Sequence, residues 1–178
     1  IKENLSFTYP VFSPPGGKSK RVILLLHGLN ERSWTKYLAW GFYLSERTGS
    51  HVILFPISFH INRSPVSWKD PRIMNSLLVK RNDTEKDINL STFANFALSE
   101  RLSEDPLRFF SSGLQSVKDI VKLVNSIKQG YHPTIEKCRD LDIFSYSIGA
   151  FLAQIILMAN PGGHFSDSRL FMFCGGSV

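Results

Sequence analysis

The sequence predicts an α/β protein with a mostly parallel, twisted sheet and helices on both faces. Residues 21–26 and 51–57 are short, nearly continuous apolar runs, and residues 140–145 repeat the pattern. Runs of this length are typical of strands buried on both faces of a parallel sheet. Helical patterns lie between the runs, and strands that alternate with helices indicate this fold class.

The first elements follow from local signals. Residues 5–12 alternate loosely and end at a Pro-Pro-Gly-Gly turn at residues 14–17, which predicts a leading strand. The apolar run 21–26 follows this turn. Ser33 can then cap a helix that runs to Arg47, with Gly49 as its stop.

The second half of the chain continues the alternation. Residues 113–130 repeat apolar side chains every three or four positions, which predicts an amphipathic helix. Residues 149–159 are apolar almost all round and predict a buried helix, and residues 169–174 predict a fourth buried strand. Residues 58–110 are irregular and carry a helical pattern at 91–103. We expect one domain over residues 1–178, with 58–110 as an insertion that forms a lid or a wall of a pocket.

Composition excludes several classes of protein. The chain has 178 residues, 43% of them hydrophobic and 20% charged, which is ordinary for a globular domain. The net charge is +6, but the basic residues are scattered and the densest runs, at 18–21 and 80–86, are short. We therefore expect no nucleic-acid partner. The fourteen phenylalanines favour a large aromatic core or an apolar pocket.

No cofactor or metal motif stands out. Gly17-Lys18-Ser19 imitates the end of a phosphate-binding loop, but the pattern needs a glycine where Phe12 stands, and a strand follows instead of a helix. No Gly-rich dinucleotide fingerprint follows a strand. Cys138 and Cys174 lie too far apart for zinc or redox spacing. We expect neither cofactor nor metal.

The most informative motif is Ser145-Tyr146-Ser147-Ile148-Gly149. A predicted buried strand runs into it and a predicted buried helix leaves it, which is the context of a nucleophile elbow. Ser147 would lie on the tight turn with strained backbone angles and an exposed hydroxyl. The helix start favours negative charge there. The alternative interpretation is a serine that only caps the helix.

A second motif, His27-Gly28-Leu29-Asn30, ends the first buried strand. Together the two motifs resemble α/β-hydrolase-fold enzymes, in which a His-Gly strand precedes the elbow strand. The order also fits: leading strand, His-Gly strand, helix, strand, helix, elbow strand, elbow helix, strand. The resemblance implies a lipase-like or esterase-like serine hydrolase. Ser147 would attack a small-molecule acyl substrate, and the backbone N–H groups of Leu29 and Ile148 would form the oxyanion hole.

Two features depart from this pattern. Ser145 stands where the usual motif has glycine. The resemblance also implies an acid and then a histidine on later strands, but His164 and Asp167 both precede the last predicted strand. We expect the chain to be a fragment that lacks the C-terminal strands of the fold. The alternative is a non-catalytic α/β-hydrolase-like protein that binds or serves as a scaffold.

Three further side chains lie beyond the carboxyl ends of predicted strands, where active sites of α/β proteins form. Glu31, His60 and Arg63 are candidates for substrate contact, and His60 is also a candidate base. No apolar run is long enough for a membrane span, and the first residues, Ile1-Lys2-Glu3-Asn4, do not read as a signal peptide. Four glycosylation sequons are only weak evidence for secretion, because sequons often arise by chance. We therefore favour a soluble, intracellular protein. The sequence does not determine the oligomeric state.

Overall fold

A computed structural model describes residues 1–68, 70, 72–73, 75–76, 79 and 93–175. Its strands are β1 (Val11–Phe12), β2 (Arg21–Leu26), β3 (His51–Phe55), β4 (Asp140–Tyr146) and β5 (Leu170–Phe173). The helices are α1 (Thr35–Thr48), α3 (Phe93–Glu104), α4 (Arg108–Gln129) and α5 (Ile148–Ala159). The basic run at 80–86 and Ser91, within the predicted helix 91–103, lie outside the described residues.

The five strands form one sheet in the order β1-β3-β2-β4-β5. β1 is antiparallel to β3, and the other neighbours are parallel. In the centre, Leu26 is level with Phe55 of β3 and Ser145 of β4. The carboxyl ends of β2, β3 and β4 therefore lie side by side, and the segments that follow them emerge at one edge of the sheet. We call this the carboxyl edge, and the opposite side the amino edge.

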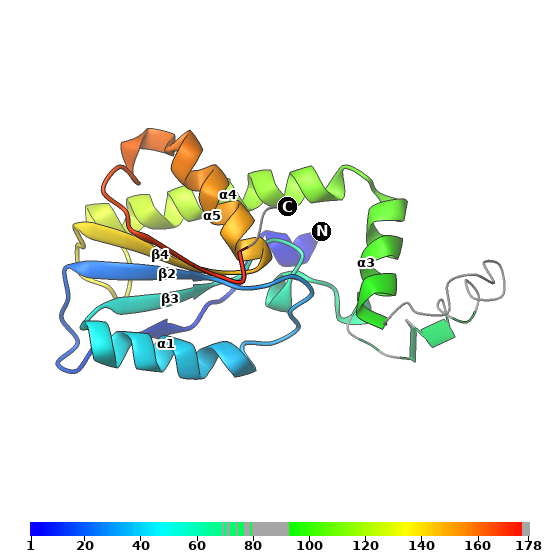
Figure 1. The fold of residues 1–178 in the computed structure, drawn as a ribbon, viewed down its shortest axis with the longest axis horizontal. Coiled ribbons are helices and arrows are strands. Elements are labelled where there is room, and N and C mark those ends of the chain that lie inside the picture. The colour runs from blue at the N-terminus through cyan, green and yellow to red at the C-terminus, as the bar shows by residue number, and fades with distance from the viewer. Residues whose placement is uncertain (69, 71, 74, 77–78, 80–92, 176–178) are drawn as a thin grey trace.

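Helices cover both faces of the sheet, as the sequence predicts (Figure 1). Side chains that alternate along β2 divide the core, because successive residues of a strand point to opposite faces. Leu24 and Leu26 pack beneath α4 and α5, while Ile23 and Leu25 pack with Tyr37 of α1. Both faces of the strand are buried, which explains its continuous apolar sequence. α3 lies beyond the carboxyl edge, apart from the sheet (Figure 1).

Two boundaries differ from the sequence prediction by more than two residues. The leading strand 5–12 is reduced to Val11–Phe12. Pro10 has no N–H to donate, so the ladder begins only where its carbonyl accepts a hydrogen bond from Leu54 N–H at 3.0 Å. α4 begins at Arg108, five residues before the predicted start, because the helix continues through Gly113 and no proline lies between Pro106 and its end. The end of the predicted insertion thus belongs to the helix layer.

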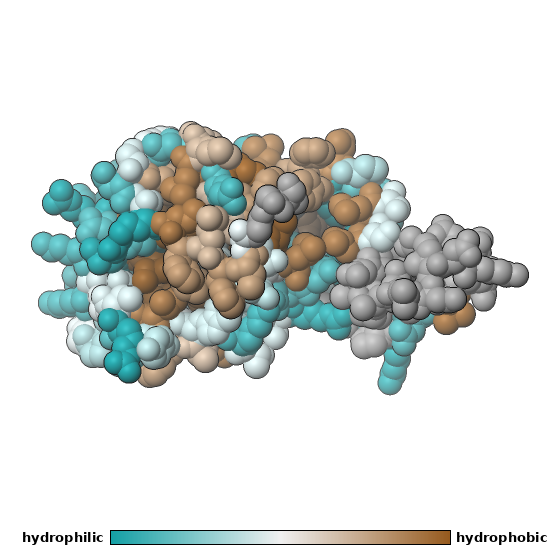
Figure 2. Space-filling model, viewed as in Figure 1, coloured by the Kyte–Doolittle hydropathy of each residue, from teal (hydrophilic) through white to brown (hydrophobic). Residues whose placement is uncertain are grey.

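Apolar side chains are exposed on one side of the molecule. Figure 2 shows them over β5, α5 and the beginning of α4. They include Phe110, Leu114, Phe171, Met172 and Phe173. Among the described residues β5 pairs only with β4 and forms an edge of the sheet. No helix in the described part of the chain has the length and apolar character needed to cross a membrane.

Candidate active site

Ser147 occupies the turn between β4 and α5, and its backbone angles are φ 54° and ψ −121°. Non-glycine residues avoid this region, at a cost of about 1–3 kcal/mol. Two hydrogen bonds hold the turn: Ser147 N–H donates to Phe173 carbonyl at 3.1 Å, and Ala150 N–H donates to the Ser147 carbonyl at 2.8 Å. The predicted strain at Ser147 is confirmed. Ser147 is partly exposed at the carboxyl edge, and its hydroxyl has no hydrogen-bond partner among the described residues.

Small residues on either side of Ser147 let the helix approach the sheet. A Cβ added to Gly149 would lie 2.7 Å from the Leu26 carbonyl oxygen and 2.8 Å from that of His27. This approach leaves room only for glycine. Ser145, which replaces the usual glycine on the other side, is fully buried and donates its hydroxyl to the Phe171 carbonyl at 3.2 Å. The departure at position 145 is therefore compatible with the turn.

The His27-Gly28 segment follows β2, beside the Ser147 turn. The fully buried His27 ring donates from Nδ1 to the Gly28 carbonyl at 2.8 Å and accepts from Ile57 N–H on Nε2 at 2.9 Å. A carbonyl can only accept and an N–H can only donate, so the ring is neutral. Burial lowers the pKa of His27 to about 3, and nearby His60 adds to the effect. Both nitrogens are engaged, so His27 ties the ends of β2 and β3 together and has no free nitrogen for chemistry.

Tyr37 holds the same segment from α1, a role that the sequence analysis missed. Its fully buried hydroxyl accepts from Gly28 N–H at 2.9 Å and donates to Glu31 Oε1 at 2.8 Å. Burial raises the pKa of Tyr37 well above its ordinary value. Glu31 also pairs with Lys36. Glu31, predicted to contact substrate, therefore binds Tyr37 and Lys36 and stabilises the turn that carries Leu29.

A cavity of about 370 Å³ opens beside the elbow, between α4, α5 and the segments that follow β2 and β3. This volume is in the range of small-molecule sites. Leu29, Ile148 and His60, three of the predicted site residues, line it together. Its remaining walls are almost entirely apolar and include Ile57, Phe109, Phe110, Leu114, Val117, Phe151, Leu152 and Ile155. Phe109 and Phe110, from the end of the predicted insertion, are thus part of a pocket wall.

The two backbone N–H groups predicted for the oxyanion hole belong to cavity-lining residues. Ile148 begins α5, where N–H groups lack partners within the helix. Neither Ile148 N–H nor Leu29 N–H donates to another residue that the structure describes. Both N–H groups are therefore unpaired among the described residues.

Arg63 lies away from the cavity, which corrects its prediction as a substrate contact. Its side chain is fully buried and donates to Asp119 Oδ2 at 2.6 Å, to Asn4 Oδ1 at 3.1 Å and to the Pro56 carbonyl at 3.1 Å. The guanidinium also lies 4.0 Å from the ring centre of Phe7. Its donors are used to hold the N-terminal segment against α4, so Arg63 has a structural role.

As the sequence predicts, the acid and the histidine that follow Ser147 in the chain do not lie near it. His164 and Asp167 lie in the connection from α5 to β5, which leads to the amino edge, opposite Ser147. His51 begins β3 at that same edge. Of the five histidines, His27 and His60 lie at the carboxyl edge, and of these two His60 has a ring nitrogen without a hydrogen bond to a described residue. No group of three or more metal-ligating side chains occurs among the described residues.

These observations define a mixed α/β protein with a five-stranded, mostly parallel sheet and a strained serine turn beside an apolar cavity. The chain belongs to DUF6051, a family of unknown function whose match covers residues 1–178. Neither the curated proteins nor the solved structures contain a match to it.

Proposed function

We propose that this chain carries the nucleophile and oxyanion hole of a serine hydrolase of the α/β-hydrolase type, acting on a carboxylic ester or related acyl substrate. The observation that carries the proposal is the backbone of Ser147. A serine with φ 54° between a parallel strand and a buried helix has the backbone strain expected of a nucleophile elbow, which supports the proposal. A serine that merely caps a helix has extended, unstrained angles, so capping does not account for this conformation.

The order of elements adds support. The leading strand, the His-Gly strand, α1, β3, the helices, the elbow strand and α5 follow the order that the resemblance implies. The His-Gly strand β2 also pairs directly with the elbow strand β4. Adjacent parallel strands bring the segments after them together, as an oxyanion hole with one donor from each requires.

The residues suggest a division of labour. Ser147 Oγ attacks the acyl carbon, and the carbonyl oxygen that becomes negative accepts from the N–H groups of Leu29 and Ile148. The N-terminus of α5 favours this charge. The acyl chain enters the cavity, whose walls at Phe109, Phe110 and Phe151 fit an apolar group. The hydroxyl proton of Ser147 passes to a histidine base: the one that the family resemblance implies on a later strand or, within the described residues, His60.

The alternative is a non-catalytic protein of the same fold that binds an apolar ligand. One observation favours it: no base is hydrogen-bonded to Ser147 Oγ among the described residues. A serine without a base keeps only the rate enhancement that the oxyanion hole and binding supply, about 10³–10⁴ over water in well-studied enzymes. We therefore expect the 178-residue chain alone to hydrolyse activated esters weakly.

An active-site-directed fluorophosphonate probe distinguishes the two functions. We expect the protein produced from the full gene to be labelled at Ser147. Labelling should be lost in Ser147→Ala and retained in Ser166→Ala, a matched change at an exposed serine of the α5–β5 connection. Absence of labelling in the full gene product would overturn the hydrolase proposal and favour the binding protein. Strong labelling of the 178-residue chain that His60→Ala abolishes would identify His60 as the base.

A further inference from the structure

The polar side chains of the cavity share one unusual arrangement. Among the residues that line it, only His60 and Ser112 have polar side chains. His60 Nδ1 donates to the Ser58 carbonyl at 2.9 Å, and Ser112 Oγ donates to the same carbonyl at 3.0 Å. Each group therefore uses its hydrogen on the Ser58 carbonyl and retains only lone pairs to offer a ligand.

The hydrogen bond to Ser58 fixes the state of the His60 ring. Because a carbonyl oxygen can only accept, Nδ1 must carry the proton, and in the neutral ring Nε2 is then an acceptor. Nε2 has no partner among the described residues. Nε2 is also accessible to solvent, because it is not one of the fully buried polar atoms that lack a hydrogen-bond partner. His60, which lines the cavity, thus has an imidazole acceptor without a partner among the described residues, in a wall that is otherwise almost entirely apolar.

The protein holds this ring rigidly. Ser58 N–H donates to Ser116 Oγ at 3.0 Å, and the Ser58 carbonyl accepts from Ser112 Oγ at 3.0 Å, so both polar groups of the Ser58 backbone are bonded to α4. The residues on either side of His60 are strained: φ is 65° at Phe59 and 50° at Ile61. For a β-branched residue such as isoleucine this is a marked outlier. Such strain gathers at binding and catalytic sites.

We propose that the cavity binds a ligand with an apolar body and one hydrogen-bond donor, a hydroxyl or an amide N–H, which His60 Nε2 accepts. The apolar body contacts Phe109, Phe151 and Leu152, and the donor reaches the segment after β3. If the proposed function holds, this ligand is part of the acyl substrate, and the inference then names the substrate class. A binding measurement tests it without hydrolysis, so the failure of either proposal can be recognised separately.

The test compares hexanol with hexyl methyl ether, which has the same apolar body without a donor. Titrations of the 178-residue chain, followed by NMR, should show tighter binding of hexanol by about threefold to tenfold, as expected for one net hydrogen bond. His60→Phe should remove this preference and leave ether binding in place. In a second pair, hexanamide should bind more tightly than its N,N-dimethyl form if an amide N–H is the preferred donor.

The ¹⁵N shift of His60 Nε2 provides a readout that needs no variant. It should move on addition of hexanol and stay in place with the ether. Equal binding of donor and non-donor ligands by the wild-type chain, a preference that persists in His60→Phe, or no binding of any probe would overturn the proposal. Fluorophosphonate labelling of Ser147 could still occur in each of these cases, because it tests the nucleophile and not the acceptor.

The pH dependence of binding gives an independent prediction for hexanol and hexyl methyl ether. Burial lowers the pKa of His60; Arg63 and Arg101 also lower it, and Glu31 and the hydrogen bond to Ser58 oppose the shift. His27, the other titratable ring in contact with it, remains neutral to about pH 3. Below its pKa, His60 becomes a donor on both nitrogens, so the preference for hexanol should weaken or reverse toward the ether. An unchanged preference through this transition would contradict an acceptor role.

Discussion

The two edges of the sheet differ in the residues that adopt positive φ angles. At the amino edge, every residue with positive φ that precedes a parallel strand is a glycine except Asn160, and these glycines are Gly16, Gly17, Gly49, Gly130, Gly162 and Gly163. At the carboxyl edge, the positive-φ residues among those described are not glycine: Asn30, Phe59, Ile61, Ser147 and Cys174. Glycine adopts positive φ readily, whereas other residues are strained there. The carboxyl edge therefore retains side chains where the backbone would favour glycine.

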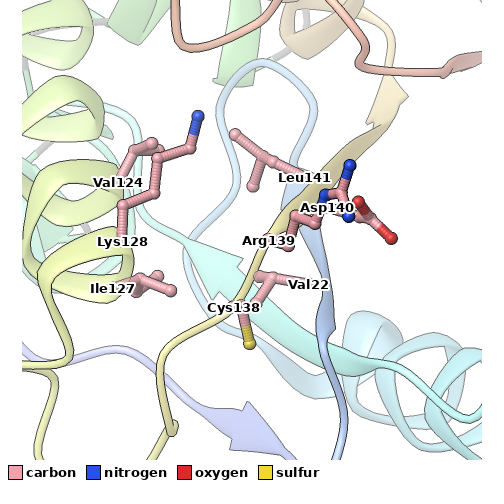
Figure 3. Close-up of a pocket in the computed structure, with 8 residues that line it drawn as sticks. All are labelled: Val22, Val124, Ile127, Lys128, Cys138, Arg139, Asp140 and Leu141. Carbon is pink, nitrogen blue, oxygen red and sulfur yellow. The ribbon is translucent and has the colours of Figure 1, made fainter.

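The cavities at the two edges differ in volume. Figure 3 shows the amino-edge pocket, where Val124, Ile127 and Lys128 of α4 face Val22 and the start of β4. Its volume is about 10 Å³, close to the minimum that holds one water molecule. The carboxyl-edge cavity measures about 370 Å³. The amino edge is packed for stability, and the edge that carries the strain also has room for a ligand.

The largest expected effect is on the free energy of unfolding, and it compares one ion pair from each edge. Asp119→Ala should lower the free energy of unfolding by about 3–5 kcal/mol, because it leaves the charge of the fully buried Arg63 without its carboxylate partner. The matched change Asp142→Ala removes the partner of Arg169, whose side chain is 67% exposed. Water can replace that partner, so the loss should be much smaller. Urea unfolding curves of both variants measure the difference; equal losses would show that burial does not distinguish the pairs.

The second effect concerns acid stability and His27. Its ordinary pKa is about 6.5 in the unfolded chain and falls to about 3 in the folded protein. Between these values the unfolded state binds a proton that the folded state does not, so the free energy of unfolding falls as the pH falls. His27 alone contributes up to about 1.4 kcal/mol per pH unit in this window.

His27→Gln removes this titration. Whatever its stability at pH 8, its unfolding free energy should depend less steeply on pH between 6 and 4 than that of the wild type. Chemical unfolding at a series of pH values measures the two slopes. Parallel slopes would mean that His27 takes up a proton in the folded state, and that its hydrogen bonds to Gly28 and Ile57 do not persist in acid.

How far the sequence could predict this fold depended on how local each signal was. β2, β3 and β4 were predicted to within two residues, because a strand buried on both faces needs a continuous apolar run. The Ser147 turn was predictable because its strand, its small neighbours and its helix are contiguous in sequence. The start of α4 was misplaced, because the aromatic pair Phe109-Phe110 was attributed to the insertion.

Roles that depend on distant partners could not be predicted from the sequence. Arg63 follows β3, a position that favours substrate contact, yet its partners Asn4 and Asp119 are more than fifty residues away in sequence. Tyr37 occupies a helix position that pattern analysis assigns to the core. Only the folded structure shows that its hydroxyl bonds to Gly28 N–H. Likewise, the tautomer of His60 depends on the Ser58 carbonyl and could not be derived from composition or spacing.

The smallest expected effect tests the backbone strain itself. It places a glycine at a strained carboxyl-edge position and removes one at the amino edge. Ser147→Gly relieves φ 54° and should raise the free energy of unfolding by about 1 kcal/mol after the entropy cost of glycine, while it abolishes fluorophosphonate labelling. Gly49→Ala does the opposite at the amino edge. The added Cβ meets no atom within 4 Å, so only the backbone at φ 63° is strained, and stability should fall by about 1 kcal/mol. Ser147→Ala is the control, because it removes the hydroxyl but keeps the strain; if it matched Ser147→Gly in thermal unfolding, the stored strain at this edge would be disproved.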